Sequence, residues 1–320
     1  MVGEHLSADL TDTQWLCELE EIAETEGYFS SLGDDHAGIF IDGAKEMLFV
    51  SFETRLGIRS TSETALPLGF NVCEAQGWSH LTVLSLTDKW FRDHHVYCFF
   101  DRMVDEGFFE DYDTVVFYGA GMCGYAAAAF SVVSPGATVL AIAPQATLTP
   151  AVAGWDTRFP HTAMLDFTSR YGYAPDMLEA AAAAHIFFDP NEVEDAMHAA
   201  LFRGPNIHHH RYRRGRSGAI DADFRAMSLI TRFTQLAEQD RLTRRTINRE
   251  LRHRRDHIPY LRTLLAKAMT ENRPHLAAKV CRHVLADRNL PRFRAALEAA
   301  EEKIALQARN QASALDNFPA

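Results

Sequence analysis

The sequence predicts an α/β protein in which a mostly parallel sheet carries helices on both faces and is followed by a region of helices alone. Apolar runs alternate with amphipathic or alanine-rich stretches over about residues 38–235, a pattern typical of parallel strands joined by crossover helices. Near the middle, TVVFYGAGMCGYAAAAFS (114–131) reads as a strand, a glycine turn and a helix. From about Ala219 onward the apolar pattern is helical only.

The elements follow from local patterns along the chain. Residues 1–35 predict an acidic amphipathic helix, TQWLCELEEIAETEG, and a polar loop. Two apolar runs around Asp42 and Gly43 predict a β-hairpin, because Asp-Gly is a strong turn signal. The remaining expected elements, in order, are helix 66–78, strand 80–86, helix 93–109, strand 113–119, helix 125–133, strand 137–144, an irregular stretch 145–174, helix 175–184, strand 185–189, helix 193–202, strand 206–213 and a helix from about Ile220.

The C-terminal part is expected to form helical hairpins. Proline-containing stops at 272–274 and 289–291 divide it, and the segments between them have apolar faces. Such segments are compatible with a short helical-repeat array or with a helical cap on the α/β domain. The domain prediction is an N-terminal extension (1–35), an α/β domain (36–235), a basic helical-hairpin region (236–310) and a disordered tail (311–320).

Charge is divided unevenly along the 320 residues. The net charge is −11, but residues 1–199 carry 8 Lys and Arg against 31 Asp and Glu, whereas residues 200–320 carry 24 against 12. The basic part could lie against the acidic domain, another subunit or another anionic surface. Because it has no nucleic-acid-binding module and few aromatics among its arginines, a nucleic-acid partner is not favoured. A homo-oligomer is compatible with the sequence.

Cysteine usage and hydropathy predict a cytoplasmic protein without a membrane span. The five cysteines are scattered and include no C-x-x-C pair, which argues against a disulfide framework or a zinc site. The first residues have neither the basic nor the apolar region of a signal peptide. The most apolar stretch is interrupted by Ser-Pro-Gly at 134–136, short of the roughly 20 residues that a span requires. No metal or cofactor is expected.

The glycine turn has two competing interpretations. Gly119, Gly121 and Gly124 match the G-x-G-x-x-G fingerprint of dinucleotide-binding folds. The same turn also matches small-x-nucleophile-x-small, the nucleophile elbow, with Gly119 and Cys123 at the small positions and residue 121 as the nucleophile. The next strand ends without the carboxylate that would bind ribose, and the turn comes after several earlier elements, which favours the elbow.

FYGAGMCGYAAAAFS resembles the elbow of small bacterial α/β-hydrolases of the GSSMGGY type, over about residues 38–235. That resemblance implies a triad acid after the strand HIFFD, at Asp189, and a histidine after the last strand. The chain also resembles a bacterial group often labelled phosphoadenosine phosphosulfate reductase. Neither the S-G-G-x-D-S loop nor the E-C-G-x-H motif of that activity occurs here, so the reductase activity is not carried over.

The catalytic part of the elbow is incomplete in this sequence. The nucleophile position falls on Gly121, and the loop expected to supply the base offers only Arg214, Arg216 and Ser217. Since a triad needs a nucleophile, a base and an acid together, Ser-His-Asp hydrolysis is not expected. Cys123 is the alternative nucleophile, because a helix N-terminus lowers the pKa of a thiol. It also occupies the second small position of the elbow, where a side chain is usually tolerated for packing only, and a buried, inert Cys123 is the favoured interpretation.

The binding part of the elbow is retained. The N–H of Met122 at the helix N-terminus, together with the loop of Glu53, Thr54 and Arg55, is expected to hold an anion or an acyl carbonyl. Arg170, in FTSRYGY, is expected to close over it.

Two groups of polar residues have weaker patterns. The histidines at 208–210 are expected to form an edge-strand cluster, because neighbours on a strand point to opposite faces. His161 and Asp166 are candidates by position alone.

Three functions follow from these observations. The first is a degenerate α/β-hydrolase-like protein that binds a small acyl or anionic ligand, or a protein partner. The second is a hydrolase or acyltransferase that uses Cys123 with Asp189. The third is a nucleotide-binding oxidoreductase that uses the Gly119, Gly121 and Gly124 loop.

Overall fold

The structure is a computed structural model that describes residues 6–7, 9–213 and 219–316. It divides into two compact units, Met1–Asn248 and Arg249–Ala320. Among the described residues, no helix has the length and apolar character needed to cross a bilayer.

The first unit is built on one eight-stranded sheet with the order β1-β2-β4-β3-β5-β6-β7-β8. β1 and β2 pair antiparallel, as do β2 and β4, and every other neighbouring pair is parallel. The strands are β1 (Gly27–Leu32), β2 (His36–Ile41), β3 (Lys45–Thr54), β4 (Trp78–Ser85), β5 (Thr114–Ala120), β6 (Thr138–Ile142), β7 (Ala183–Phe188) and β8 (Ile207–Arg211). This confirms the predicted α/β-hydrolase-like fold.

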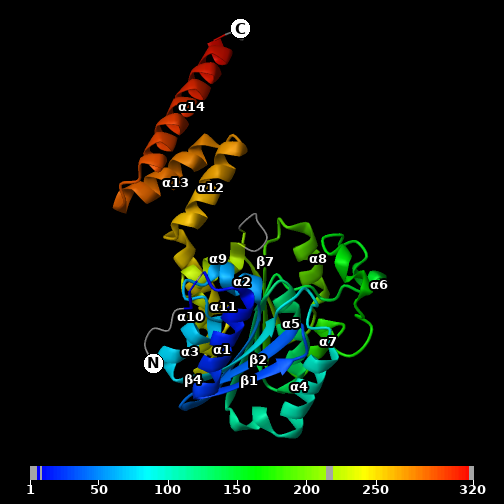
Figure 1. The fold of residues 1–320 in the computed structure, drawn as a ribbon. Coiled ribbons are helices and arrows are strands. Elements are labelled where there is room, and N and C mark those ends of the chain that lie inside the picture. The colour runs from blue at the N-terminus through cyan, green and yellow to red at the C-terminus, as the bar shows by residue number, and fades with distance from the viewer. Residues whose placement is uncertain (1–5, 8, 214–218, 317–320) are drawn as a thin grey trace. The chain divides into compact units, whose positions relative to one another are not determined.

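Helices cover both faces of the sheet, as Figure 1 shows. α4, α5 and α8 pack with the strands in the larger apolar core, and α1 packs on β1 and β2 in a second core on the other face. The helices of this unit are α1 (Asp12–Glu26), α2 (Arg55–Thr61), α3 (Leu68–Cys73), α4 (His94–Asp105), α5 (Met122–Phe130), α6 (Pro150–Ala153), α7 (Ala174–Met177), α8 (Val193–Leu201), α9 (Ala219–Ala226) and α10 (Leu229–Glu238), and α11 (Arg244–Glu250) follows at its end. Because helices cover both faces, β3 and β4 in the middle of the sheet are almost continuously buried, as parallel strands are.

The hairpin predicted at Asp42 and Gly43 is wrong. β2 and β3 are not neighbours, because β4 lies between them in the sheet. Gly43 instead passes against the start of β4: its N–H donates to Ser79 Oγ at 2.9 Å, and a β-carbon there would lie 2.3 Å from the carbonyl carbon of Trp78. The glycine therefore permits a close crossing rather than a tight turn. The hairpin is formed one element earlier, by β1 and β2, where a polar loop was expected.

The helix predicted over 175–184 is also much shorter than expected. α7 ends at Met177, and the alanines that follow join the sheet region. Gly136 N–H donates to Ala180 O at 2.8 Å, and Ala182 N–H donates to Ala137 O at 3.0 Å before β7 begins. Pairing with the loop before β6 outweighs the helix propensity of alanine here.

The second unit is helical and has a small core of its own. Leu261, Leu265, Cys281, Val284 and Phe293 are among its buried residues. Its helices are α12 (Ile258–Thr270), α13 (Pro274–Asp287) and α14 (Pro291–Asp316). The two predicted proline stops coincide with the starts of α13 and α14, and α14 extends into the stretch 311–320 that was expected to be disordered.

Candidate functional site

The turn between β5 and α5 has a nucleophile-elbow backbone with a glycine at its apex. Gly121 has φ 58° and ψ −125°, a conformation that residues with a side chain rarely adopt. Its N–H donates to Ile142 O at 2.8 Å, and its own oxygen accepts from Tyr125 N at 3.0 Å. These bonds tie the turn to β6 and to the first turn of α5. The chain thus forms a turn suited to presenting a side chain, without having one there.

The glycines of the turn differ in what surrounds them. A β-carbon at Gly119 would lie 2.0 Å from the carbonyl oxygen of Cys123, and one at Gly124 would lie 3.1 Å from Ile142 O. At Gly121, by contrast, no atom lies within 4 Å of the β-carbon position. Close packing of strand and helix therefore requires Gly119, whereas a side chain at 121 would project into open space.

Met122 begins α5 and supplies a backbone donor at the predicted position. No acceptor in the described part of the chain takes the N–H of Met122. An N–H group at the N-terminus of a helix is directed away from the helix and has a partial positive charge. This group can therefore donate to an anion or to a carbonyl oxygen.

A cavity of about 840 Å³ lies beside Met122 at the carboxyl ends of β3 and β4. Thr54, Arg55 and Met122, three of the predicted binding residues, all line it. This volume is within the usual range for small-molecule sites. The structure therefore brings together the two sides of the expected pocket, although Arg55 belongs to α2 rather than to a loop.

Cys123 is buried immediately behind the turn. Its side chain is buried, and burial raises the pKa of its thiol, with Glu53 and Asp221 adding to the shift. The lowered pKa expected from the helix N-terminus is not found, because desolvation of the thiolate outweighs the helix dipole. No histidine in the described residues is hydrogen-bonded to the Cys123 thiol.

Asp189 lies directly after β7, where the triad acid was expected, and is buried. Its Oδ1 accepts from the backbone N–H of Asn191 at 2.8 Å and from Asn191 Nδ2 at 2.7 Å. Arg214, Arg216 and Ser217, the residues expected at the base position, lie outside the described residues. Asp189 is thus where the prediction put it, and its partners seen here stabilise the local turn.

A buried charged cluster near the elbow was missed from the sequence. Glu53 is not in a loop but in β3, where it accepts from Leu68 N–H at 2.8 Å and from Ser51 Oγ at 3.1 Å. Arg225 of α9 pairs with Glu53 at 3.5 Å and with Asp221 at 2.9 Å. The sequence feature that could have indicated this cluster is Glu53, a carboxylate at the end of the otherwise apolar run MLFVSFE.

The Glu53 cluster joins α9 to the sheet. Tyr118 of β5 donates to Asp221 of the same helix, so two strands contact it. Burial raises the pKa of Glu53 despite the opposing effect of Arg225. These contacts fix α9 to the sheet.

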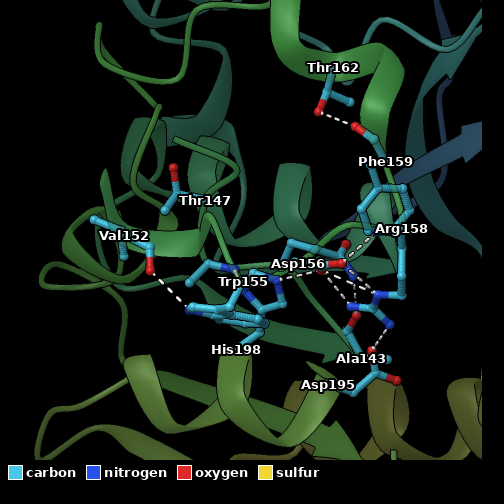
Figure 2. Close-up of polar contacts among 12 residues, drawn as sticks. Ala143, Thr147, Val152, Trp155, Asp156, Arg158, Phe159, Thr162, Asp195 and His198 are labelled. Atoms are coloured by element: carbon cyan, nitrogen blue, oxygen red, sulfur yellow. Dashed lines mark hydrogen bonds and ion pairs between the residues drawn. The ribbon is translucent and has the colours of Figure 1, made fainter. Parts of the chain in front are cut away.

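The segment after β6 is anchored to α8 by a second buried network, shown in Figure 2. His198 Nε2 lies 3.0 Å from Asp156 Oδ2, and Ala146 N–H donates to His198 Nδ1 at 3.2 Å. Arg158 bridges Asp156 at 2.8 Å and Asp195 at 2.6 Å. The part of the irregular stretch 145–174 that contains Ala146, Asp156 and Arg158 is therefore held in place. Nothing in VEDAMHAAL distinguished His198 from any other helix residue.

Arg170 does not close over the elbow as expected. Its guanidinium pairs with Asp101 of α4 at 2.7 Å and lies over the ring of Tyr97. His161 instead approaches the cavity, with its Nε2 2.6 Å from Oδ2 of Asp88, a residue that lines it. Asp166 caps its own turn by accepting from Thr168.

The histidines of β8 lie on an edge strand, as expected. His210 is buried, with its Nε2 3.0 Å from Nδ1 of His185 on β7. Among the described residues, no group of His, Cys, Asp or Glu side chains has the arrangement needed to hold a metal ion.

No protein-family model matches the chain. No curated protein matches it. The solved structures that it resembles include the capsule O-acetyltransferase of Neisseria meningitidis serogroup A, with 11% identity over 62% of this chain and 92% of that one, and a TM-score of 0.42. A hyperthermophilic esterase from the archaeon Pyrobaculum calidifontis has 13% identity over 75% and 94%, with a TM-score of 0.44.

The glycosylation-associated Gap123 complex of Streptococcus agalactiae is also similar, with 16% identity over 63% of this chain and a TM-score of 0.43. The match spans 44% of that chain, less than half of its length.

Proposed function

We propose that this chain is an α/β-hydrolase-like binding protein that holds a small acyl or anionic ligand in the cavity beside Met122, without serine-triad hydrolysis. One observation carries the proposal. The elbow retains its backbone geometry and its N–H donor next to a cavity of about 840 Å³, while its apex residue, Gly121, has no side chain. The donor that would stabilise an oxyanion is present, and the group that would attack the carbonyl is missing.

The chemistry of the cavity indicates the class of ligand. The Met122 N–H carries the partial positive charge of a helix N-terminus, and Arg55 adds a full charge in the same cavity. Both groups donate hydrogen bonds and neither accepts them. A carbonyl, carboxylate or phosphate oxygen is the matching acceptor.

A proline at position 122 tests the proposal directly. Met122→Pro removes the N–H, and proline is tolerated at the first position of a helix. Met122→Ala is the matched control, because it removes the side chain and keeps the N–H. The probe is hexanamide, a neutral carbonyl compound, titrated by isothermal calorimetry.

The proposal predicts that the wild type and Met122→Ala bind hexanamide and that Met122→Pro binds it about tenfold more weakly, the expected effect of one lost hydrogen bond. Equal binding by both variants would show that the elbow is not the site. Hydrolysis of p-nitrophenyl butyrate by the wild type, weakened by Met122→Pro, would show an esterase instead.

The alternative functions require features that the described residues do not favour. A Cys123 nucleophile would need a thiolate, and the thiol is buried with a raised pKa. A dinucleotide site would need an acidic residue after β6, and the chain continues there as Ala143-Pro144-Gln145. A protein partner of the basic helices remains a prediction from charge alone.

A further inference from the structure

Two arginines of α2 share one carboxylate at the edge of the cavity. Arg55 Nη2 lies 3.2 Å from Oδ2 of Asp12, and Arg59 Nη1 donates to Oδ1 of the same residue. Arg55 and Arg59 are one turn apart, so they lie on the same face of the helix. All three side chains line the cavity beside Met122. Among the described side chains at this end of the cavity, one carboxylate contacts two guanidinium groups, which is an excess of positive charge.

Asp12 binds the arginines as a ligand carboxylate would. Each of its two oxygens contacts a different guanidinium, so both oxygens of the carboxylate have a positively charged partner, as those of a bound carboxylate or phosphate would. Its side chain is 50% exposed, whereas those of Arg55 and Arg59 are 31% and 21% exposed. Exposed ion pairs are weak and can be exchanged, because water and salt compete for both partners. The arginines are thus the more fixed part of the pair, and Asp12 is the part that another anion can replace.

The remaining lining limits the number of charges on such a ligand. Glu63 and Asp88 also line the cavity, and Asp88 contacts His161 at 2.6 Å. A second anionic group placed near these carboxylates would be repelled. The lining therefore favours a ligand with one anionic end at α2 and an uncharged part directed toward Met122.

We propose that Arg55 and Arg59 form the subsite for the single carboxylate or phosphate group of the ligand, and that Asp12 occupies this subsite until the ligand displaces it. This inference rests on the proposed function, since it assigns the charged end of the ligand in the same cavity. The uncharged end is left to the Met122 N–H.

Three probes with the same alkyl chain test the inference. Hexanoate carries a carboxylate, hexyl phosphate carries a phosphate, and hexanamide carries neither charge. Each is titrated into the full-length protein by isothermal calorimetry at low and high salt. The two anions distinguish a carboxylate subsite from a phosphate subsite, and hexanamide reports on the elbow alone.

Substitution of the arginines should weaken the anionic probes much more than the neutral one. Arg55→Ala and Arg59→Ala are each expected to weaken hexanoate or hexyl phosphate about tenfold, the loss of a charge-assisted hydrogen bond, and to weaken hexanamide by a much smaller factor. Arg59→Lys keeps the charge without the planar fork and is expected to have an intermediate effect. Arg59 also donates to Leu10 O, and Arg59→Ala removes this contact. If Arg59→Ala does not fold, Arg59→Lys is the variant that tests the subsite.

Removal of the internal carboxylate should strengthen binding. Asp12→Asn is expected to bind the preferred anion about fivefold more tightly, because the ligand no longer has to displace an ion pair. Asp101→Asn is the matched control. It removes the carboxylate of a comparably exposed Arg170–Asp101 pair whose residues do not line this cavity.

The outcomes separate this inference from the function on which it rests. Anion affinities unchanged in Arg55→Ala and Arg59→Lys, with hexanamide still sensitive to Met122→Pro, would overturn the subsite and leave the proposed function standing. Weaker anion binding in Asp12→Asn would also overturn it. If neither the wild type nor Asp12→Asn binds any of the three probes, both proposals fail.

Discussion

At the scale of single residues, Gly121 determines what chemistry the elbow can perform. Its φ of 58° would strain any residue with a β-carbon, yet no neighbouring atom blocks a side chain. A serine could therefore be accommodated at the cost of backbone strain alone. It would still lack its base, since the loop sequence RRGRSG after β8 contains no histidine.

We therefore predict that Gly121→Ser folds and remains inactive. The positive φ should cost about 1–2 kcal/mol, which lowers the midpoint of thermal unfolding by about 3–6 °C. Without a base to deprotonate the serine, no hydrolysis of p-nitrophenyl butyrate above the wild-type level is expected. Calorimetry and an esterase assay measure the two effects. Rapid p-nitrophenol release by the variant would mean that a base lies within reach of residue 121.

The five cysteines should differ strongly in reactivity. Cys17 and Cys98 are exposed, and Cys98 Sγ lies 3.2 Å from His94 Nε2, whereas Cys73, Cys123 and Cys281 are buried. We expect iodoacetamide at neutral pH to label the two exposed cysteines first and Cys123 only after unfolding, because the thiolate is the reactive form and burial disfavours it. Peptide mapping with and without urea measures this. Early labelling of Cys123 in the folded protein would support the alternative function in which Cys123 is the nucleophile.

Residue patterns predicted the site only in part, for identifiable reasons. The positions of Thr54, Arg55, Met122 and Asp189 follow from strand ends, which a sequence shows directly. Arg59, Asp12 and His198 could not be found in this way. They meet their partners through packing between elements distant in sequence, and their own surroundings are ordinary amphipathic helix.

At the scale of elements, several strands each contain one buried histidine. Burial lowers the pKa of His36 on β2 to about 4, and those of His80 on β4 and of His185 and His210 on β7 and β8 to about 3. In the unfolded chain these rings are expected to titrate near 6.5. As the pH falls below about 6.5, the unfolded chain binds protons that the folded chain does not. The folded state therefore loses stability from about pH 6.5 down to about pH 4 for His36 and down to about pH 3 for the other three.

For each of these histidines the expected loss between pH 7 and pH 5 is about 2 kcal/mol. Urea unfolding at the two pH values measures it. His80→Phe keeps an aromatic ring against Phe70. In this variant the loss of unfolding free energy between pH 7 and pH 5 should be smaller by about 2 kcal/mol, the contribution of one histidine. A free energy of unfolding that did not change between these pH values would show that the rings are protonated in the folded protein.

The two errors at the element scale have a common cause. Asp-Gly and an alanine run are strong local signals, but at both places the chain pairs with a segment that is not its neighbour in sequence. The elements with the strongest periodicity, from β4 through β6, were located within a few residues. Short-range patterns specify which segments are strands, whereas the order of strands depends on contacts between distant segments.

At the scale of the whole molecule, the chain consists of two units with separate cores. The site residues, from Asp12 to Arg225, all belong to the first unit, Met1–Asn248. The second has its own buried residues around Leu265 and Cys281. We therefore expect a chain that ends at Asn248 to fold and to bind hexanamide like the full chain.

Circular dichroism and calorimetry of the shortened chain measure this. Binding reduced tenfold, with the helix and strand signal of the first unit intact, would assign the second unit a part in the site. The loss of much of the basic charge of residues 200–320 should also lower the isoelectric point, which isoelectric focusing can confirm.

The open space at Gly121 has a consequence for how such a protein is detected. Fluorophosphonate reagents identify serine hydrolases by covalent capture of the elbow hydroxyl, and here the elbow has no hydroxyl to capture. A chemical survey of cell extracts would therefore pass over this chain, although its backbone has the same turn. A protein that keeps the elbow but lacks its hydroxyl has to be detected by ligand binding. Protection from heat or proteolysis by a bound ligand is a suitable readout, whereas reaction with a covalent reagent is not.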